Sequence, residues 1–171
     1  LLQFAKPEEY AGYVERHAPE TVIDDCLPLV RHLLKKAEIQ IVRDGQATRR
    51  VLMNRTELQQ VIVNLIVNAI HAMPDGGALT LRSSNSNADG KAGVSIDVSD
   101  TGIGMTPDLM ERIFDPFFTT RMGRGGTGLG LSISHQIATA VLGGSLKVTS
   151  KLGHGSTFVL SFPADRKDSQ D

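Results

Sequence analysis

A nearly continuous apolar segment, residues 61–73 with the sequence VIVNLIVNAIHAM, carries two asparagines four positions apart. Asparagine is a mediocre helix former, and a buried amide without partners costs roughly 1–3 kcal/mol. On a helix over residues 56–73, at about 100° per residue, one arc of roughly 80° collects every strongly polar side chain after the first turn. The sequence therefore predicts a helix that is buried on most sides and shows one narrow polar stripe: Glu57, Gln60, Asn64, Asn68 and His71.

The content of this stripe favours a ligand over water. A solvated helix face normally carries lysine and glutamate, whereas this stripe carries two amides inside an apolar segment. An amide oxygen is a neutral hard ligand that suits Mg²⁺, which keeps several waters and takes few protein ligands. We therefore expect the stripe to face a cavity, where it adds no carboxylate that would repel a polyphosphate. The alternative is an ordinary solvated edge.

The remaining pattern predicts an α/β chain. Further helices are expected at residues 21–38, with Thr21 as a candidate cap, and at 131–142. Strands are expected at 39–42, 49–53, 78–82, 94–98, 145–149 and 156–162, residues 83–91 read as a polar loop, and 1–15 as a helix end and linker. Helices and strands mixed with hairpin-like connections favour a two-layer α/β sandwich, a mixed sheet packed against helices, over a doubly wound parallel sheet.

Composition excludes several classes of function. The net charge of −1 provides no global positive field for nucleic acid, so none is expected as a partner. Cys26 is the only cysteine, which rules out an internal disulfide and a multi-cysteine metal site and suits a reducing compartment. With no stretch of about 20 apolar residues, we expect no membrane contact by this chain. We expect it in the cytoplasm, whether or not the parent protein is anchored in a membrane.

The sequence DTGIG at residues 100–104 follows an apolar strand pattern. Asp100 at the strand end would give a fixed hydrogen-bond acceptor. Gly102 and Gly104 would let the backbone pass close to a flat ligand. An ordinary Asx-turn is the alternative, since this motif alone is a weak signal.

A second glycine cluster, GRGGTGLG at residues 123–130, leads directly into an apolar helix. Glycines before a helix let backbone N–H groups reach phosphate oxygens, helped by the positive end of the helix dipole. The cluster lacks the Lys-Ser or Lys-Thr pair of a P-loop, and no strand runs into it as in a dinucleotide fingerprint. A flexible linker is the alternative reading.

A third motif, GHGSTF at residues 153–158, reads as a tight turn into the last strand. Thr157 would offer a hydroxyl near Asp100 if the two strands were neighbours. Without that context a routine β-turn is the plainer interpretation.

In this order and spacing, the pieces resemble the ATP-binding domain of sensor histidine kinases (the GHKL or HATPase_c family, with the Bergerat-type fold), which is related to DNA gyrase, mismatch-repair ATPases and heat-shock chaperones. The asparagine helix resembles the N box, and the three glycine motifs resemble the three glycine boxes. The sequence IFDPFFTT at 113–120 resembles the phenylalanine box of the kinase branch. The resemblance covers residues 20–163, with 1–19 as the end of a dimerisation helix and linker and 164–171 as a disordered tail.

The resemblance implies a role for each matching position. Asn68 would hold Mg²⁺, and Asn64 would support the metal or the phosphates. Asp100 would bind the adenine amino group, with Gly102 and Gly104 lining the base and Thr157 helping to fix it. Residues 105–127 would form a mobile ATP lid. The residues expected to approach the phosphates lie at its end or just after it: Gly126, Thr127, Gly128, Leu129 and Gly130. Arg121 and Arg124, inside the lid, are the cationic catalytic candidates.

The implied activity is transfer of the ATP γ-phosphoryl group to a histidine on a dimerisation domain, with a response regulator downstream in a two-component system. None of His17, His32, His71, His135 or His154 has the acceptor setting of a histidine followed by an acidic and a basic residue. The start, LLQFAKP, resembles the end of a dimerisation helix, so the acceptor is expected upstream. His71 stands where many relatives have a lysine, and a phosphate contact there would depend on pH.

Two alternative functions share the motifs. A gyrase-type ATPase would need a glutamate four residues before the metal asparagine, and Asn64 stands there instead. A nucleotide-dependent interaction module, such as an anti-sigma type regulator, would bind ATP and a protein partner without a sensory receptor.

Overall fold

The computed structural model describes residues 14–88, 90–116, 118 and 130–165. Within these residues strands and helices are mixed along the chain, which ends in a hairpin of two strands. The elements are β1 (Val14–His17), α2 (Pro19–Lys36), β2 (Ile39–Gly45), β3 (Val51–Asn54), α3 (Arg55–Ala72), β4 (Gly77–Ala88), β5 (Lys91–Asp100), α4 (Pro107–Met110), α5 (Gly130–Gln136), the π-helical turn η2 (Ile137–Val141), β6 (Ser145–Lys151) and β7 (Gly155–Pro163).

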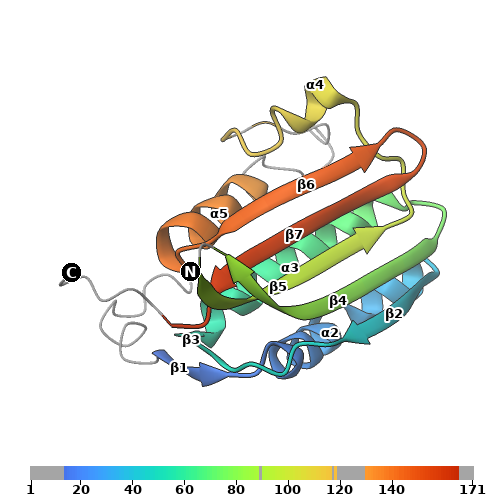
Figure 1. The fold of residues 1–171 in the computed structure, drawn as a ribbon. Helices are drawn as coiled ribbons and strands as arrows, with labels where there is room; N and C mark the ends of the chain where they lie inside the picture. The colour runs from blue at the N-terminus through green and yellow to red at the C-terminus, as the bar shows by residue number, and fades with distance from the viewer. Residues whose placement is uncertain (1–13, 89, 117, 119–129, 166–171) are drawn as a thin grey trace, which may run out of the picture.

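The strands form one five-stranded mixed sheet and one short ribbon. The sheet order is β2-β4-β5-β7-β6, in which β2 and β4 are parallel and the other pairs are antiparallel. Strands β1 and β3 pair antiparallel beside it. Helices α2 and α3 lie behind the sheet in Figure 1, so that helices and sheet form two layers. The predicted two-layer α/β sandwich with a mixed sheet is confirmed.

Helix α3 is the centre of the core. It contacts α2 on one side and α5 on the other, and it packs on β5 and β7. Seven of its side chains are buried, at the spacing that the apolar pattern predicted: Leu58, Val61, Ile62, Leu65, Ile66, Ala69 and Ile70. The helix starts at the Asn54 cap, whose side chain accepts hydrogen bonds from the backbone N–H groups of Thr56 and Glu57 at 2.9 and 3.3 Å.

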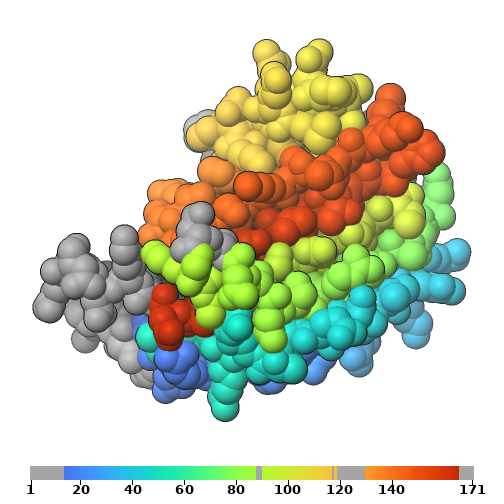
Figure 2. Space-filling view, viewed as in Figure 1, coloured from blue at the N-terminus to red at the C-terminus, as the bar shows by residue number. Residues whose placement is uncertain are grey.

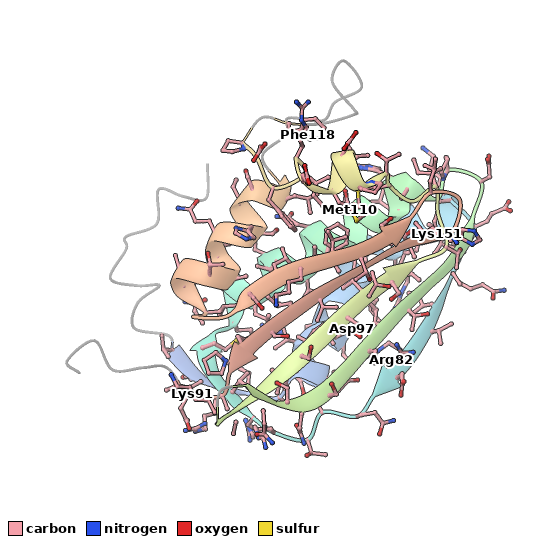
Figure 3. All side chains as sticks on the ribbon, turned by 45° about the horizontal axis from the view of Figure 1, so that its top comes forward. Arg82, Lys91, Asp97, Met110, Phe118 and Lys151 are labelled. Carbon is pink, nitrogen blue, oxygen red and sulfur yellow. The ribbon has the colours of Figure 1, made fainter. Side chains whose placement is uncertain are left out.

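The other face of the sheet carries small polar and charged side chains. Arg82 and Asp97 are opposite each other on β4 and β5, and Figure 3 shows them on this face. Burial raises the pKa of Asp97 above its usual value, and the nearby positive charge of Arg82 opposes the shift. The period-2 alternation of the strands thus separates a polar face from an apolar one.

Three expectations about local structure are wrong. The polar loop expected at 83–91 is the tip of a long hairpin, because β4 runs to Ala88 and β5 starts at Lys91. Its polar side chains have strand roles, since Asn85 accepts hydrogen bonds from the backbone N–H groups of Thr48 and Arg49 at 3.1 and 3.0 Å.

The start of the chain also differs. A strand, β1, occupies residues at the end of the expected linker, because its edge pairs with β3 in full register. Helix α2 begins after Ala18, with Pro19 in the first turn, so Thr21 is not its cap. None of the helices in the described ranges is long and apolar enough to cross a membrane.

Candidate functional site

A cavity of about 460 Å³ opens at the end of the sheet where β5 finishes. Its walls come from the C-terminal half of α3, the segment after β5, the start of α5 and the β6–β7 turn region. Figure 2 shows the segment after β5, in yellow, as a raised ridge beside β6. The lining residues are Asn68, His71, Ala72, Pro74, Asp100, Ile103, Gly104, Met105, Leu109, Ile113, Phe118, Leu131 and Ser156.

Asp100 is the one carboxylate among these lining residues. It ends β5 on the inner face of the sheet, with only 6% of its surface exposed. Its Oδ1 accepts hydrogen bonds from the backbone N–H groups of Gly102 at 2.9 Å and Ser156 at 3.2 Å. Burial raises the pKa of Asp100, while these two N–H donors act in the opposite direction. Because both bonds end on Oδ1, the second oxygen is the acceptor that a bound ligand can use.

The two glycines after Asp100 let the chain lie against its neighbours. A Cβ on Gly102 would lie 2.1 Å from the carbonyl oxygen of Ala72, at the end of α3. Gly104 has a φ of +70°, and a Cβ there would lie 2.1 Å from the carbonyl oxygen of Lys151. Gly104 lines the cavity as expected, whereas Gly102 packs on α3 and is absent from the wall. The structure therefore gives Gly102 the task of holding the loop in place.

The two amides of the α3 stripe have different surroundings. Asn68 is half-buried and lines the cavity, with His71 one turn further along and exposed. Asn64 does not line it; its Nδ2 donates a hydrogen bond to the hydroxyl of Ser134 on α5, at 3.3 Å. Ser134 is fully buried, so this bond joins two helices. The expected stripe exists, but only its C-terminal half faces the cavity.

The third glycine motif reaches the cavity through Ser156, for which the motif alone predicts no role. Thr157 Oγ1 lies 2.7 Å from Ser99 Oγ on the opposite face of the sheet, so its hydroxyl is not beside Asp100. Ser156, its neighbour, is buried on the inner face and lines the cavity. The alternation of Phe158, Leu160 and Phe162 on the inner face could have identified it, since Ser156 continues that period of two.

The segment after Gly104 supplies an apolar wall. Met105, Leu109, Ile113 and Phe118 line the cavity, and Figure 3 shows Phe118 above β6. Phe114 stacks on His135 of α5, with ring centroids 4.9 Å apart. Of the expected lid and phosphate residues, Arg121, Arg124, Gly126, Thr127, Gly128 and Leu129 lie outside the described residues, and Gly130 is the exposed first residue of α5.

The described ranges contain no group of three or more His, Cys, Asp or Glu side chains arranged to hold a metal ion. On the α3 wall of the cavity, Asn68 offers a neutral amide oxygen and His71 an imidazole ring. A single neutral oxygen fits Mg²⁺ when a bound phosphate and water supply the remaining ligands.

Comparison with known proteins identifies the family. The histidine kinase-, DNA gyrase B- and HSP90-like ATPase family matches residues 53–166, more than half of the 171-residue chain. The chain belongs to this family. The matched residues begin at the end of β3 and run past β7, and so include every described cavity wall.

Within the family, the relatives of this chain include sensor histidine kinases. The sensor histidine kinase ZraS of Escherichia coli (strain K12) is 37% identical over an alignment of 173 positions, which covers 99% of this chain and 35% of ZraS. The chain thus spans about a third of the length of that relative.

Solved structures of histidine kinases have the same fold as this chain. The nucleotide-free catalytic domain of histidine kinase ThkA superposes with a TM-score of 0.78 at 29% identity, covering 89% of this chain and 96% of that domain. ThkA has also been solved in complex with the response regulator protein TrrA. Full-length ShkA in complex with AMPPNP gives a TM-score of 0.75 at 28% identity, covering 88% of this chain and 31% of ShkA.

Proposed function

We propose that this chain is the MgATP-binding catalytic domain of a sensor histidine kinase and that it delivers the γ-phosphoryl group of ATP to a histidine on a dimerisation domain. The observation that carries the proposal is the pairing of a buried carboxylate, Asp100, with a neutral amide, Asn68, on different walls of one cavity. The first group suits the amino end of adenine, and the second suits a metal-bound triphosphate.

Adenine recognition rests on Asp100. The exocyclic amino group of adenine donates hydrogen bonds. Two backbone N–H groups hold Oδ1 of Asp100 and thereby orient the other carboxylate oxygen, Oδ2, as an acceptor for that amino group. The apolar side chains of Met105, Leu109 and Ile113 provide the surface that a flat base requires. A buried site makes the loss of this bond costly, which is how such a pocket selects one base.

The phosphate end rests on α3 and the second glycine motif. Asn68 would hold Mg²⁺, which when bound would neutralise phosphate charge. His71, next along the same wall, is the candidate for a further phosphate contact. Gly126, Thr127, Gly128, Leu129 and Gly130 are proposed to approach the phosphates, and Arg121 and Arg124 to supply positive charge to the transferring group.

The environment of Asn64 supports phosphoryl transfer to a histidine over hydrolysis of ATP. A hydrolase needs a base that accepts a proton from water, and an amide is no such base. The Asn64 amide also donates a hydrogen bond to Ser134 of α5, away from the cavity. The AMPPNP complex of ShkA supports ATP as the substrate, and the ThkA–TrrA complex supports a response regulator as the next partner. A cytoplasmic location is part of the same proposal.

The test is a transfer assay with γ-labelled ATP and Mg²⁺. This chain alone should bind nucleotide but acquire no label, whereas adding the histidine-containing dimerisation domain of the parent protein should place the label on that domain. Asn68→Ala should slow the transfer by about 100-fold or more, because metal charge is worth several kcal/mol in phosphoryl transfer.

Asn64→Ala is the matched control, since it removes the same amide one turn away. It should cost about 1 kcal/mol of stability through the unpaired Ser134 hydroxyl while leaving transfer within a few-fold of wild type. Label on this chain alone would contradict the proposed acceptor. Steady-state hydrolysis that Asn64→Ala abolishes would replace the kinase proposal with an ATPase.

A further inference from the structure

Three polar side chains form a row across neighbouring strands at the inner end of the cavity. They are Asp100 at the end of β5, Ser156 at the start of β7 and Ser150 near the end of β6. Ser156 is directly opposite Ser150, and its backbone N–H donates to Asp100 Oδ1 at 3.2 Å. Asp100 and Ser156 line the cavity, whereas Ser150 lies one strand behind them.

The Ser150 hydroxyl has three contacts. Its Oγ accepts a hydrogen bond from the backbone N–H of Met105 at 2.8 Å. It also lies 3.0 Å from the carbonyl oxygen of Gly155 and 2.7 Å from Ser156 Oγ. A hydroxyl has one proton and two lone pairs, so these three contacts use its whole capacity.

Counting protons fixes the direction of each bond. The Gly155 carbonyl has no proton, so the proton in that contact is the one on Ser150. The 2.7 Å contact between the two hydroxyls then needs its proton from Ser156. This is the one arrangement in which all three contacts are hydrogen bonds. With its proton committed to Ser150, Ser156 offers lone pairs alone to a ligand in the cavity.

We propose that Ser150 is a positioning residue for nucleotide recognition, because it turns the Ser156 hydroxyl into a fixed acceptor and anchors the backbone of Met105 on the cavity wall. This inference rests on the proposed function and deepens it by naming a source of base selectivity. The row then presents two acceptors side by side, Asp100 and Ser156, which suits a purine with a 6-amino group. A 6-oxo purine would place an acceptor against an acceptor and leave buried lone pairs unpaired.

The test measures affinities for ADP and inosine diphosphate, with Mg²⁺, by isothermal titration calorimetry. Inosine carries a carbonyl oxygen where adenine carries the amino group. Wild type should prefer ADP. In Ser150→Ala the freed Ser156 hydroxyl can rotate and donate a hydrogen bond to the carbonyl oxygen of the inosine base. The preference for ADP over inosine diphosphate should therefore fall by roughly fivefold to tenfold, which corresponds to one hydrogen bond.

Two variants distinguish the orienting role of the Ser150 hydroxyl from a general loss of packing around it. Ser150→Thr keeps the hydroxyl and should keep the wild-type ratio. Thr149→Ala removes a hydroxyl from the residue before Ser150, on the opposite face of the sheet, and should also leave the ratio of the two affinities unchanged. A general weakening of the site would lower both affinities and leave their ratio intact.

The outcomes are distinct. A wild type that binds neither nucleotide overturns the proposed function and this inference with it. A wild type that binds both equally, or a Ser150→Ala variant whose ratio stays at the wild-type value, overturns this inference and leaves the proposed function standing. If Ser150→Ala does not fold, Ser156→Ala takes its place: the ratio must narrow there too, since the acceptor itself is gone, and an unchanged ratio overturns the inference.

Discussion

Asp100→Asn should lower the affinity for ADP by about 100-fold or more without lowering the stability of the fold. Asparagine has the same shape, and its Oδ1 can keep both hydrogen bonds from the Gly102 and Ser156 N–H groups. Its Nδ2 then replaces the second oxygen, so that a donor meets the adenine amino group, which is also a donor. Calorimetric titration and thermal unfolding of the same samples measure the two effects.

The pH dependence has a defined sign. Because burial raises the folded-state pKa of Asp100 above its unfolded value, the ionised carboxyl costs the folded state free energy at neutral pH, and stability falls as the pH rises from the unfolded pKa through the folded one. Asparagine removes this cost. Nucleotide affinity in wild type should weaken as the pH falls through the folded pKa, because a protonated carboxyl loses its charge.

Asp97→Asn is the matched control for this charge change. Asp97 lies on the same strand, burial also raises its pKa, and its side chain lies opposite Arg82 on the other face of the sheet. It should leave ADP affinity at the wild-type value. Equal losses in the two variants would show that net charge matters rather than a hydrogen bond to the base.

Gly104→Ala should destabilise the fold by about 3 kcal/mol or more, because it combines two penalties. The φ of +70° disfavours any residue with a Cβ, and the new Cβ would lie 2.1 Å from the carbonyl oxygen of Lys151. Neighbouring backbone would have to move, and Gly104 lines the cavity, so ADP affinity should fall as well. The expected drop in melting temperature is roughly 6–12 °C for a chain of this size.

Gly153→Ala isolates the first penalty. Gly153 lies in the adjoining β6–β7 turn with a φ of +83°, but a Cβ there would meet no atom within 4 Å. It should therefore cost about 1 kcal/mol and leave ADP affinity unchanged. If both variants lost the same stability, the close approach of the Gly104 loop to Lys151 would have no energetic weight.

Helix α3 and its stripe were predictable because a single signal, apolar periodicity, dominates there. Seven buried side chains enforce the helix, and they leave little freedom for where Asn68 points. The position of Asp100 was equally predictable, since an aspartate that follows an apolar strand pattern lies where that strand leaves the sheet. The two-layer architecture follows from the order of such elements.

The rest depended on tertiary pairing. The β4–β5 hairpin extends through Ser, Asn and Ala residues that have low strand propensity, because Ser83 and Asn85 accept hydrogen bonds from the backbone N–H groups of residues 47–49. The division of labour between Asn64 and Asn68 depends on Ser134, seventy residues away from Asn64. Whether Ser156 or Thr157 lines the cavity depends on which face of β7 packs against α3. The alternation of apolar side chains along β7 indicates that face, whereas the glycine motif does not.

We propose that one cavity holds an adenosine nucleotide between the Asp100 carboxylate and the Asn68 amide. Calorimetric titration of wild type with ADP, with and without Mg²⁺, measures this binding. We expect one saturable site per chain whose affinity increases when Mg²⁺ is added, and whose Mg²⁺ dependence disappears in Asn68→Ala. Absence of binding heat at millimolar ADP, or binding that Asn68→Ala and Asp100→Asn leave unaltered, would contradict it.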